Sequence, residues 1–164
     1  MWYNFGMKKI AILYTKYSPV IDAIKYKLQD YQVDCIKSLN EENYDLVILS
    51  GYEGVYEENA LVCHHSLLPS FDCDEPEKQA ILTGVKITGV TIYYSKTKKI
   101  VAQYPVFINN DMHYDNLKQE LDYVEQTIFP LVIEKIVENK PFEINSLINN
   151  KCGGLCGGCS SCKH

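Results

Sequence analysis

Short apolar runs alternate with amphipathic segments along the first half of this chain. Residues 8–14 (KKIAILY) and 45–50 (DLVILS) are nearly continuous apolar runs, which is typical of strands buried on both faces of a parallel sheet. Between them, residues 19–31 place apolar side chains at helical spacing, with Pro19 in the favoured first turn. A further short strand is expected at 33–36. This alternation predicts an α/β fold with a parallel sheet.

The second half of the chain predicts the elements that close this sheet. They are a strand at 60–65, a helix at 77–82 ended by Gly84, strands at 87–95 and 99–106, and a long helix from about 115 to 139. The polar turn at 96–98 joins the last two strands as a hairpin. Pro130 lies inside the long helix and predicts a kink there. We therefore expect the sheet to end in a hairpin followed by a long helix.

Composition divides the chain into one domain and a tail. The chain has 164 residues, of which 46% are hydrophobic, and this is enough for one compact core. We assign that core to residues 7–148. Residues 149–164 are rich in glycine and cysteine and carry little apolar surface, so they predict a flexible tail.

The tail carries a cluster of four cysteines, Cys152, Cys156, Cys159 and Cys162. Thiols at this spacing can hold a zinc ion or an iron–sulfur cluster, and the glycines between them let the backbone wrap a small ion. His164 is a spare ligand. A redox-active tail, metal transfer and a disulfide pair are the alternatives. In a reducing compartment, a metal or redox site is favoured over a disulfide framework.

Charge and hydropathy limit the classes of partner. The formal net charge is −5, and the acidic residues are spread along the chain, so no basic surface is offered to a phosphate backbone. No apolar run approaches the roughly 18 residues of a membrane span, and residues 1–6 lack the order of a signal peptide. We expect a cytoplasmic protein with a small-molecule substrate, no nucleic-acid or membrane partner, and a metal or redox partner through the tail.

A histidine-containing motif at 63–71 (CHHSLLPSF) carries the strongest functional signal. It resembles the His-Pro-Ser-Leu-Leu-Pro-Ser-Phe signature of the phosphoribosylglycinamide formyltransferase family. The segments 45–52, 84–91, 101–106 and 128–130 resemble the flanking segments of that family in order and spacing. Several motifs in register make the resemblance specific.

The resemblance implies the formyltransferase fold, an α/β fold with a Rossmann-like open, mostly parallel sheet. It also implies 10-formyltetrahydrofolate as formyl donor and a phosphoribosylglycinamide-like amine as acceptor. Attack of an amine on the formyl carbon places negative charge on the formyl oxygen, and this charge needs preorganised hydrogen-bond donors. By resemblance, His64 is the catalytic donor. The residues that the resemblance assigns to the donor or substrate are Gly51, Tyr52, Ser66, Leu67, Leu68, Pro69 and Gln103.

The chain departs from the family pattern at two catalytic positions. Val62 stands where the family has an asparagine, and its side chain cannot donate a hydrogen bond. The turn at 95–99 (SKTKK) stands where a longer family loop carries an aspartate. Its lysines would disfavour the charged form of His64, which a carboxylate would favour. The nearby carboxylates that remain as substitutes are Asp72, Asp74 and Glu75.

Two further positions differ from the family. The turn after the first strand, residues 15–19 (TKYSP), lacks the glycines that let a backbone approach a phosphate, although Lys16 and Ser18 can still contact one. His65 stands where the family has proline and is expected at the surface or beside the site residues. The acceptor is therefore open. The alternative to a divergent formyltransferase is an inactive fold that binds a ligand or partner and uses its tail for metal, iron–sulfur or redox chemistry.

Overall fold

The computed structural model describes residues 8–38 and 43–141. Its elements, in chain order, are β1 (Lys9–Leu13), α1 (Pro19–Lys27), β2 (Gln32–Ile36), β3 (Leu46–Leu49), β4 (Leu61–His64), α2 (Pro76–Thr83), β5 (Ile87–Tyr94), β6 (Ile100–Phe107) and α3 (Tyr114–Val137). Each strand and helix expected from the sequence is confirmed within this part of the chain. The tail expected at 149–164, with its four cysteines, lies outside the described residues.

The strands form one mixed sheet in the order β2-β1-β3-β4-β5-β6. The pairs β1–β2, β1–β3 and β3–β4 are parallel, whereas β4–β5 and β5–β6 are antiparallel. The open α/β sheet with a closing hairpin is therefore confirmed. β1 lies between β2 and β3. The chain runs from β1 to β2 on one side and then crosses back to β3 on the other side, so the position between β1 and β3 is a topological switch point.

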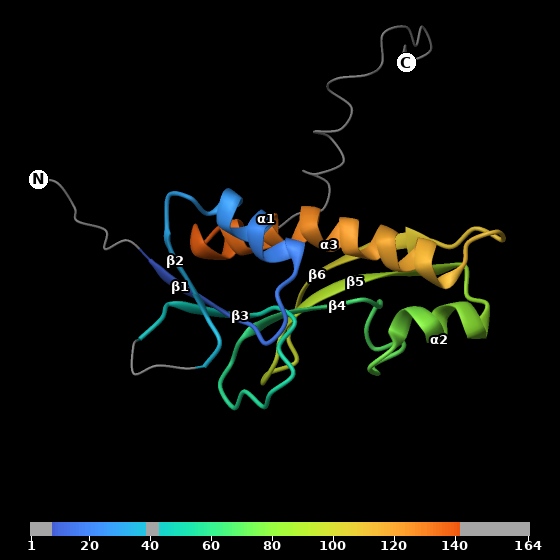
Figure 1. Cartoon of the computed structure of the whole chain (residues 1–164), viewed down its shortest axis with the longest axis horizontal. Helices are drawn as coiled ribbons and strands as arrows, with labels where there is room; N and C mark the ends of the chain where they lie inside the picture. Colours follow the sequence, from blue (N-terminus) through green and yellow to red (C-terminus); the bar gives the residue numbers. More distant parts are fainter. Residues whose placement is uncertain (1–7, 39–42, 142–164) are drawn as a thin grey trace, which may run out of the picture.

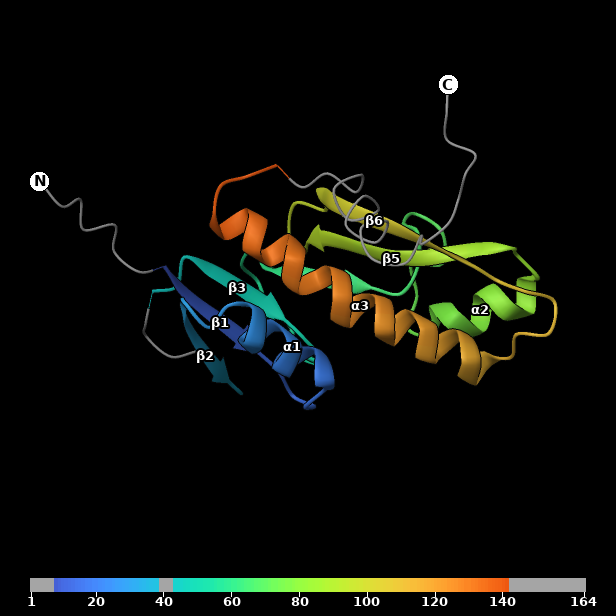
Figure 2. The same cartoon turned by 90° about the horizontal axis from the view of Figure 1, so that it is seen from above.

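Two helices, α1 and α3, lie side by side on one face of the sheet (Figures 1 and 2). They bury the apolar stripes that the sequence predicted, including Ile21 and Ile24 of α1 and Leu121 and Ile128 of α3, which are at most 5% exposed. The buried side chains form one continuous core with Ile10 and other strand residues. This layer anchors the parallel strands, whose carboxyl ends all reach the same edge.

Two details of the helices concern Ser18, just before α1, and Pro130, inside α3. Ser18 occupies the N-cap position of α1, but its hydroxyl makes no capping hydrogen bond and instead lies 3.4 Å from the hydroxyl of Ser50. Pro130 is buried inside α3, which continues as one helix to Val137. In the described part of the chain, no helix is long and apolar enough to cross a membrane.

The close approach of β5 and β6 at Gly89 generates a stability prediction. A Cβ atom at Gly89 would overlap the backbone oxygen of Tyr104 on β6. We expect Gly89→Ala to lower the free energy of unfolding by about 3 kcal/mol, as overpacking does. Gly84→Ala is the control: Gly84 has a φ of +72° but no atom within 4 Å, so the cost should be about 1 kcal/mol. Urea unfolding measures both, and equal losses would contradict the steric account.

Candidate functional site

A crevice opens at the carboxyl ends of the parallel strands, beside the switch point. Strands β3 and β4 pair only as far as Leu49 and Val62 and then diverge. The space between them is about 280 Å³ and is lined by Lys16, Leu49, Ser50, Gly51, Tyr52, Glu53, Val62, Cys63 and Glu125. Ligands of open α/β sheets bind at such a position. A larger hollow of about 600 Å³ lies at residues such as Lys8, Tyr56 and Val137, but no residue of the 63–71 motif lines it.

Gly51 joins the two loops that form one wall of this crevice. Its carbonyl oxygen accepts hydrogen bonds from the backbone N–H groups of Thr15 and Lys16, at 3.1 and 3.0 Å. Its φ is +60°, and a Cβ atom would lie 2.7 Å from the backbone oxygen of Lys16. Glycine is therefore required here by both conformation and space. Gly51 and Tyr52 both line the crevice, and their contact with a ligand stays a prediction.

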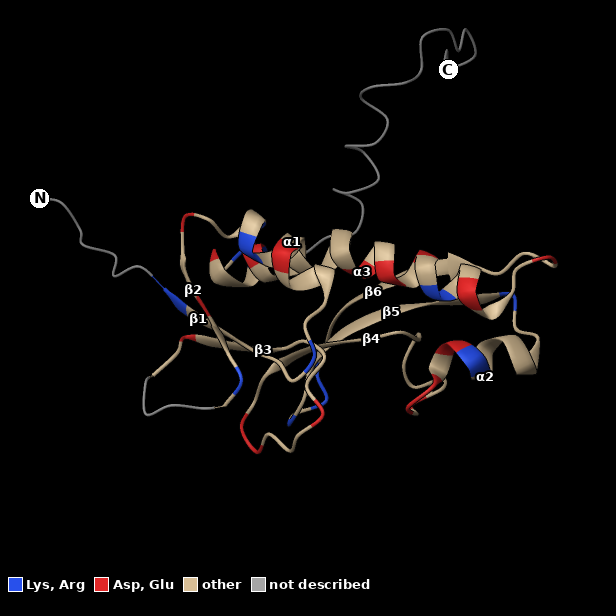
Figure 3. Cartoon of the chain, in the orientation of Figure 1, with Lys and Arg blue, Asp and Glu red and all other residues tan. Residues whose placement is uncertain are grey.

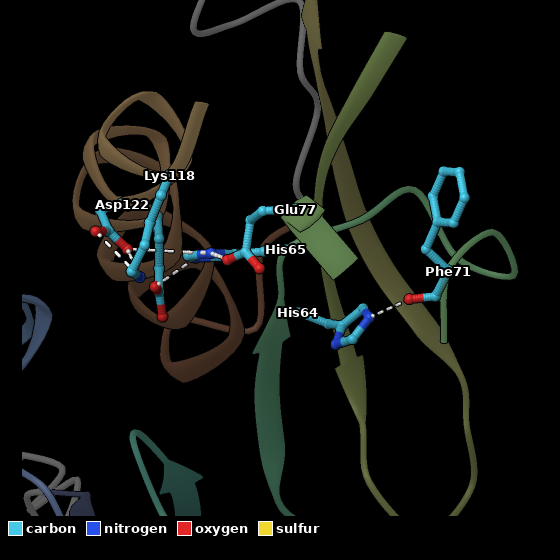
Figure 4. A network of polar contacts seen from close by, with 7 residues as sticks. His64, His65, Phe71, Glu77, Lys118 and Asp122 are labelled. Atoms are coloured by element: carbon cyan, nitrogen blue, oxygen red, sulfur yellow. Dashed lines mark hydrogen bonds and ion pairs between the residues drawn. The ribbon is translucent and has the colours of Figure 1, made fainter. Parts of the chain in front are cut away.

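His64 ends β4 and points away from α3, toward Phe71 at the end of the motif (Figure 4). Its Nε2 atom lies 3.0 Å from the backbone oxygen of Phe71. A carbonyl oxygen only accepts hydrogen bonds, so Nε2 carries a proton and donates. The Nδ1 atom makes no hydrogen bond within the described part of the chain and is the ring nitrogen left for a ligand.

Buried and half-buried hydrogen bonds stabilise the loop after His64. The Ser66 hydroxyl donates to the backbone oxygen of Ser70 at 2.6 Å, and the Thr91 hydroxyl donates to the backbone oxygen of Ser66 at 2.6 Å. The side-chain amide of Gln103 donates to the backbone oxygen of Leu68 at 2.9 Å. Ser66 and Gln103 were expected to bind a ligand; in this structure their polar groups shape the loop.

The remaining motif residues form the turn of this loop. Leu67 and Leu68 are half-buried and Pro69 is exposed, and the peptide bond between Leu68 and Pro69 is cis. A methyl carbon of Leu67 lies close to Gly89 of β5, which ties the turn to the sheet. The turn therefore supports the end of β4.

His65 points the opposite way, toward α3, and joins two helices (Figure 4). Its Nδ1 atom lies 2.7 Å from Glu77 Oε1 on α2, and its Nε2 atom lies 2.9 Å from Glu125 Oε2 on α3. Two carboxylates that both accept require two N–H donors, and only the imidazolium has both. Asp122, which is paired with Lys118, lies 4.0 Å from Nδ1.

The charges of this cluster follow from its burial and hydrogen bonds. Burial alone would lower the pKa of His65, but hydrogen bonds with Glu125 and Glu77 raise it to about 9. Burial would raise the pKa of Glu77, but its hydrogen bond with His65 and a backbone hydrogen bond lower it. The His65 side chain is 13% exposed, so the expected surface position is wrong; it contacts Glu125, which lines the crevice.

Glu125 is one of the crevice residues that the sequence analysis assigned no role. It lies on α3 and reaches the crevice wall next to Cys63. Burial, and then the charge of Glu125, raise the pKa of the Cys63 thiol well above its usual value, so this thiol stays protonated at neutral pH. The available signal was the spacing of three charged residues, Lys118, Asp122 and Glu125, along one side of this amphipathic helix.

The lysine turn at 95–99 is partly neutralised. Lys96 Nζ lies 3.7 Å from Glu58 Oε2, and Lys98 Nζ lies 5.2 Å from the centroid of the Tyr93 ring. Acidic and basic residues are interspersed over the described surface, including this region (Figure 3). The positive charge that these lysines place near His64, where the family has an aspartate, is therefore smaller than the number of lysines indicates.

The described residues also contain one group with metal-ligating atoms. His65, Asp122 and Glu125 offer atoms within 4.8 Å of one another. Both nitrogens of His65 already donate to carboxylates, so this group is an ion-pair cluster. Cys35, Cys63 and Cys73 are free thiols.

Comparison with known proteins agrees with the motif and with the sheet. Residues 14–133 match the family model described as formyl transferase. Phosphoribosylglycinamide formyltransferase of Bacillus subtilis is 27% identical over 114 residues, which cover 62% of this chain and 58% of that protein. Methionyl-tRNA formyltransferase of Staphylococcus epidermidis (strain RP62A) is 24% identical over 135 residues, covering 71% and 44%. The chain thus spans less than two thirds of either relative.

Solved structures share the fold. The phosphoribosylglycinamide formyltransferase from Bacillus halodurans has a TM-score of 0.67 and 25% identity, covering 83% of this chain and 100% of the other. The enzyme from Anaplasma phagocytophilum has a TM-score of 0.70 at 18% identity, covering 81% and 88%. The fold expected from the sequence is confirmed.

The His65 cluster generates a pH-dependent stability prediction. A raised pKa means that the stabilisation by His65 is complete below about pH 6.5 and is lost as the pH rises toward 9. We expect the wild type to lose on the order of 2 kcal/mol across that range. Glu77, whose pKa is lowered, loses its contribution on the acid side, below about pH 4.5.

The matched variant is His65→Gln, which keeps a donor but no charge. Its unfolding free energy, measured in urea at several pH values, should be lower than that of wild type at pH 6 and close to it at pH 9.5. The same deficit at both pH values would contradict a charged His65.

Proposed function

Because the chain belongs to the formyl transferase family, we propose that it transfers a formyl group from 10-formyltetrahydrofolate to the amine of a small-molecule acceptor. The observation that carries this proposal is the orientation of His64. The backbone carbonyl of Phe71 accepts a hydrogen bond from its Nε2–H, and Nδ1 is left for a ligand. His64 directly follows Val62 and Cys63, the two β4 residues that line the crevice.

This orientation sets the protonation state that His64 needs. A neutral ring that donates from Nε2 has only a lone pair at Nδ1 and cannot donate to a formyl oxygen. The imidazolium can donate from both nitrogens. His64 therefore acts on the formyl oxygen in its protonated form, with the carbonyl of Phe71 holding the other N–H.

The transfer proceeds by addition and elimination. The acceptor nitrogen bonds to the formyl carbon, and the carbonyl π electrons move to the oxygen, where His64 stabilises the charge. The bond from carbon to N10 of the folate then breaks as the oxygen electrons re-form the carbonyl. The acceptor amine loses one proton, and N10 of the leaving tetrahydrofolate gains one, so atoms and charge balance.

The crevice suits an acceptor that carries both an anionic group and polar hydrogens. Lys16 and the amino end of α1 favour negative charge on one wall. Glu53 and Glu125 supply acceptors on the other walls. Phosphoribosylglycinamide, the acceptor named for several relatives, has an amine, hydroxyls and a phosphate, and is the first acceptor to test.

Calorimetry and a transfer assay test this function. We expect 10-formyltetrahydrofolate to bind, and His64→Ala to retain binding while the transfer rate falls by about a hundred- to a thousandfold, because one oxyanion donor is lost. Tyr26→Ala is the control, since this side chain on α1 is 80% exposed. No binding of the donor at high ligand concentration would overturn the proposal.

For the tail we propose, from its sequence, a metal or redox role in the reducing cytoplasm. Four thiols at Cys152, Cys156, Cys159 and Cys162 match the ligand types of zinc and iron–sulfur sites. This role also belongs to the alternative function, in which the fold binds a ligand or partner without catalysis. Protein purified without oxygen should contain zinc or iron near one site per chain.

Elemental analysis of the double variant Cys156→Ser/Cys159→Ser separates the tail from the domain. We expect this variant to lose the metal and to keep its unfolding free energy, whereas Cys35→Ser should keep the metal. Metal-free wild-type protein that takes up none on reconstitution would contradict the metal site.

A further inference from the structure

We propose that the phenol of Tyr93 is a second hydrogen-bond donor to the formyl oxygen, acting beside His64. This inference rests on the proposed function and adds a catalytic residue to it. An oxyanion is usually stabilised by more than one preorganised donor, and His64 supplies a single one from Nδ1. A second donor to the formyl oxygen must therefore come from another group on the face of the sheet that carries His64.

The pairing of β4 with β5 places Tyr93 on the His64 face. Val62 lies opposite Tyr93, and His64 lies opposite Thr91. Residues directly opposite in an antiparallel pair point to the same face, with Cβ atoms about 5 Å apart, and diagonal neighbours are about 7–8 Å apart. Tyr93 is the diagonal neighbour of His64, and a tyrosine side chain is long enough to span that separation.

The other side chains of this face offer no free donor. Val62 has no polar group. The Thr91 hydroxyl donates to the backbone oxygen of Ser66 and accepts from the backbone N–H of Leu68 and from Gln103. The Tyr93 hydroxyl makes no hydrogen bond within residues 8–38 and 43–141. Among the described side chains that β4 and β5 present here, Tyr93 is thus the uncommitted donor beside His64.

The surroundings of Tyr93 restrain its ring and keep its hydroxyl protonated. Lys98 lies over the ring, with Nζ 5.2 Å from the centroid, which restrains the side chain by a cation–π contact. Burial, and then the charge of Asp72, raise the pKa of Tyr93 above its usual value. The hydroxyl therefore remains protonated at neutral pH and is available to donate.

In the reaction, Tyr93 forms a hydrogen bond and transfers no proton. When the acceptor nitrogen bonds to the formyl carbon, the carbonyl π electrons move to the oxygen, and the O–H of Tyr93 and the Nδ1–H of His64 both donate to it. When the bond to the folate nitrogen breaks, the carbonyl re-forms and both hydrogen bonds weaken. No oxidant, reductant or further reactant is involved.

The first test is independent of the acceptor. Isotope-edited infrared spectroscopy of bound 10-formyltetrahydrofolate, labelled with ¹³C at the formyl carbon, reports hydrogen bonding to the formyl oxygen. We expect the bound carbonyl stretch of wild type to shift to lower frequency, and Tyr93→Phe to lose part of that shift. The control is Tyr94→Phe, since Tyr94 is the next residue of β5 and faces the other side of the sheet, opposite Leu61.

The second test is a rescue on the opposite strand. Tyr93→Phe should lower kcat by about a hundredfold with little change in KM for the donor. Val62→Asn/Tyr93→Phe places an amide donor directly across from position 93 and should restore part of kcat and of the infrared shift. A merely structural role for Tyr93 would change the unfolding free energy and would not be rescued by an amide at position 62.

The outcomes separate the two claims. If wild type does not bind the donor, the proposed function fails and this inference fails with it. If wild type binds and transfers the formyl group, and Tyr93→Phe keeps both the infrared shift and kcat, this inference alone is overturned.

Discussion

The clamp of His65 between Glu77 and Glu125 holds the site together. It connects the end of β4 to α2 at 2.7 Å and to α3 at 2.9 Å, and no other described residue ties the sheet to both helices through charged hydrogen bonds. Because adjacent residues of a strand point to opposite faces, fixing His65 on the α3 side also fixes His64 on the other side. The clamp and the orientation of His64 are therefore two consequences of one strand end.

The same clamp determines the electrostatics of the crevice. Glu125 lines the crevice and also accepts a hydrogen bond from His65, so its carboxylate is held in place and partly neutralised. On the opposite wall, Gly51 brings the loops after β1 and β3 together and fixes the position of Lys16. A small ligand with charges of both signs fits this arrangement better than a purely apolar one.

Much of the fold could be predicted from the sequence because it depends on the periodicity of apolar residues and on glycine and proline at the ends of helices. The runs at 8–14 and 45–50 have the composition of buried parallel strands, and Pro19 and Gly84 mark helix ends. His64 and Gly51 were predicted as site residues because the motifs around them are in register with a known family. Glu125 and Tyr93 were not assigned a role, because their positions depend on the packing of α3 and on the β4–β5 register, which one sequence does not specify. Ser66 and Gln103 were predicted to bind the donor or substrate, but their polar groups make hydrogen bonds to the backbone of Ser70 and Leu68.

The central claim is that a formyl-carrying folate binds beside His64, at the carboxyl ends of the parallel strands. Two-dimensional ¹H–¹⁵N spectra of the labelled chain, recorded during titration with 10-formyltetrahydrofolate, test it most directly. The account predicts saturable shifts centred on Gly51, Cys63, His64 and Tyr93. Shifts centred instead on the hollow near Lys8 and Val137, or no shifts at all, would contradict it.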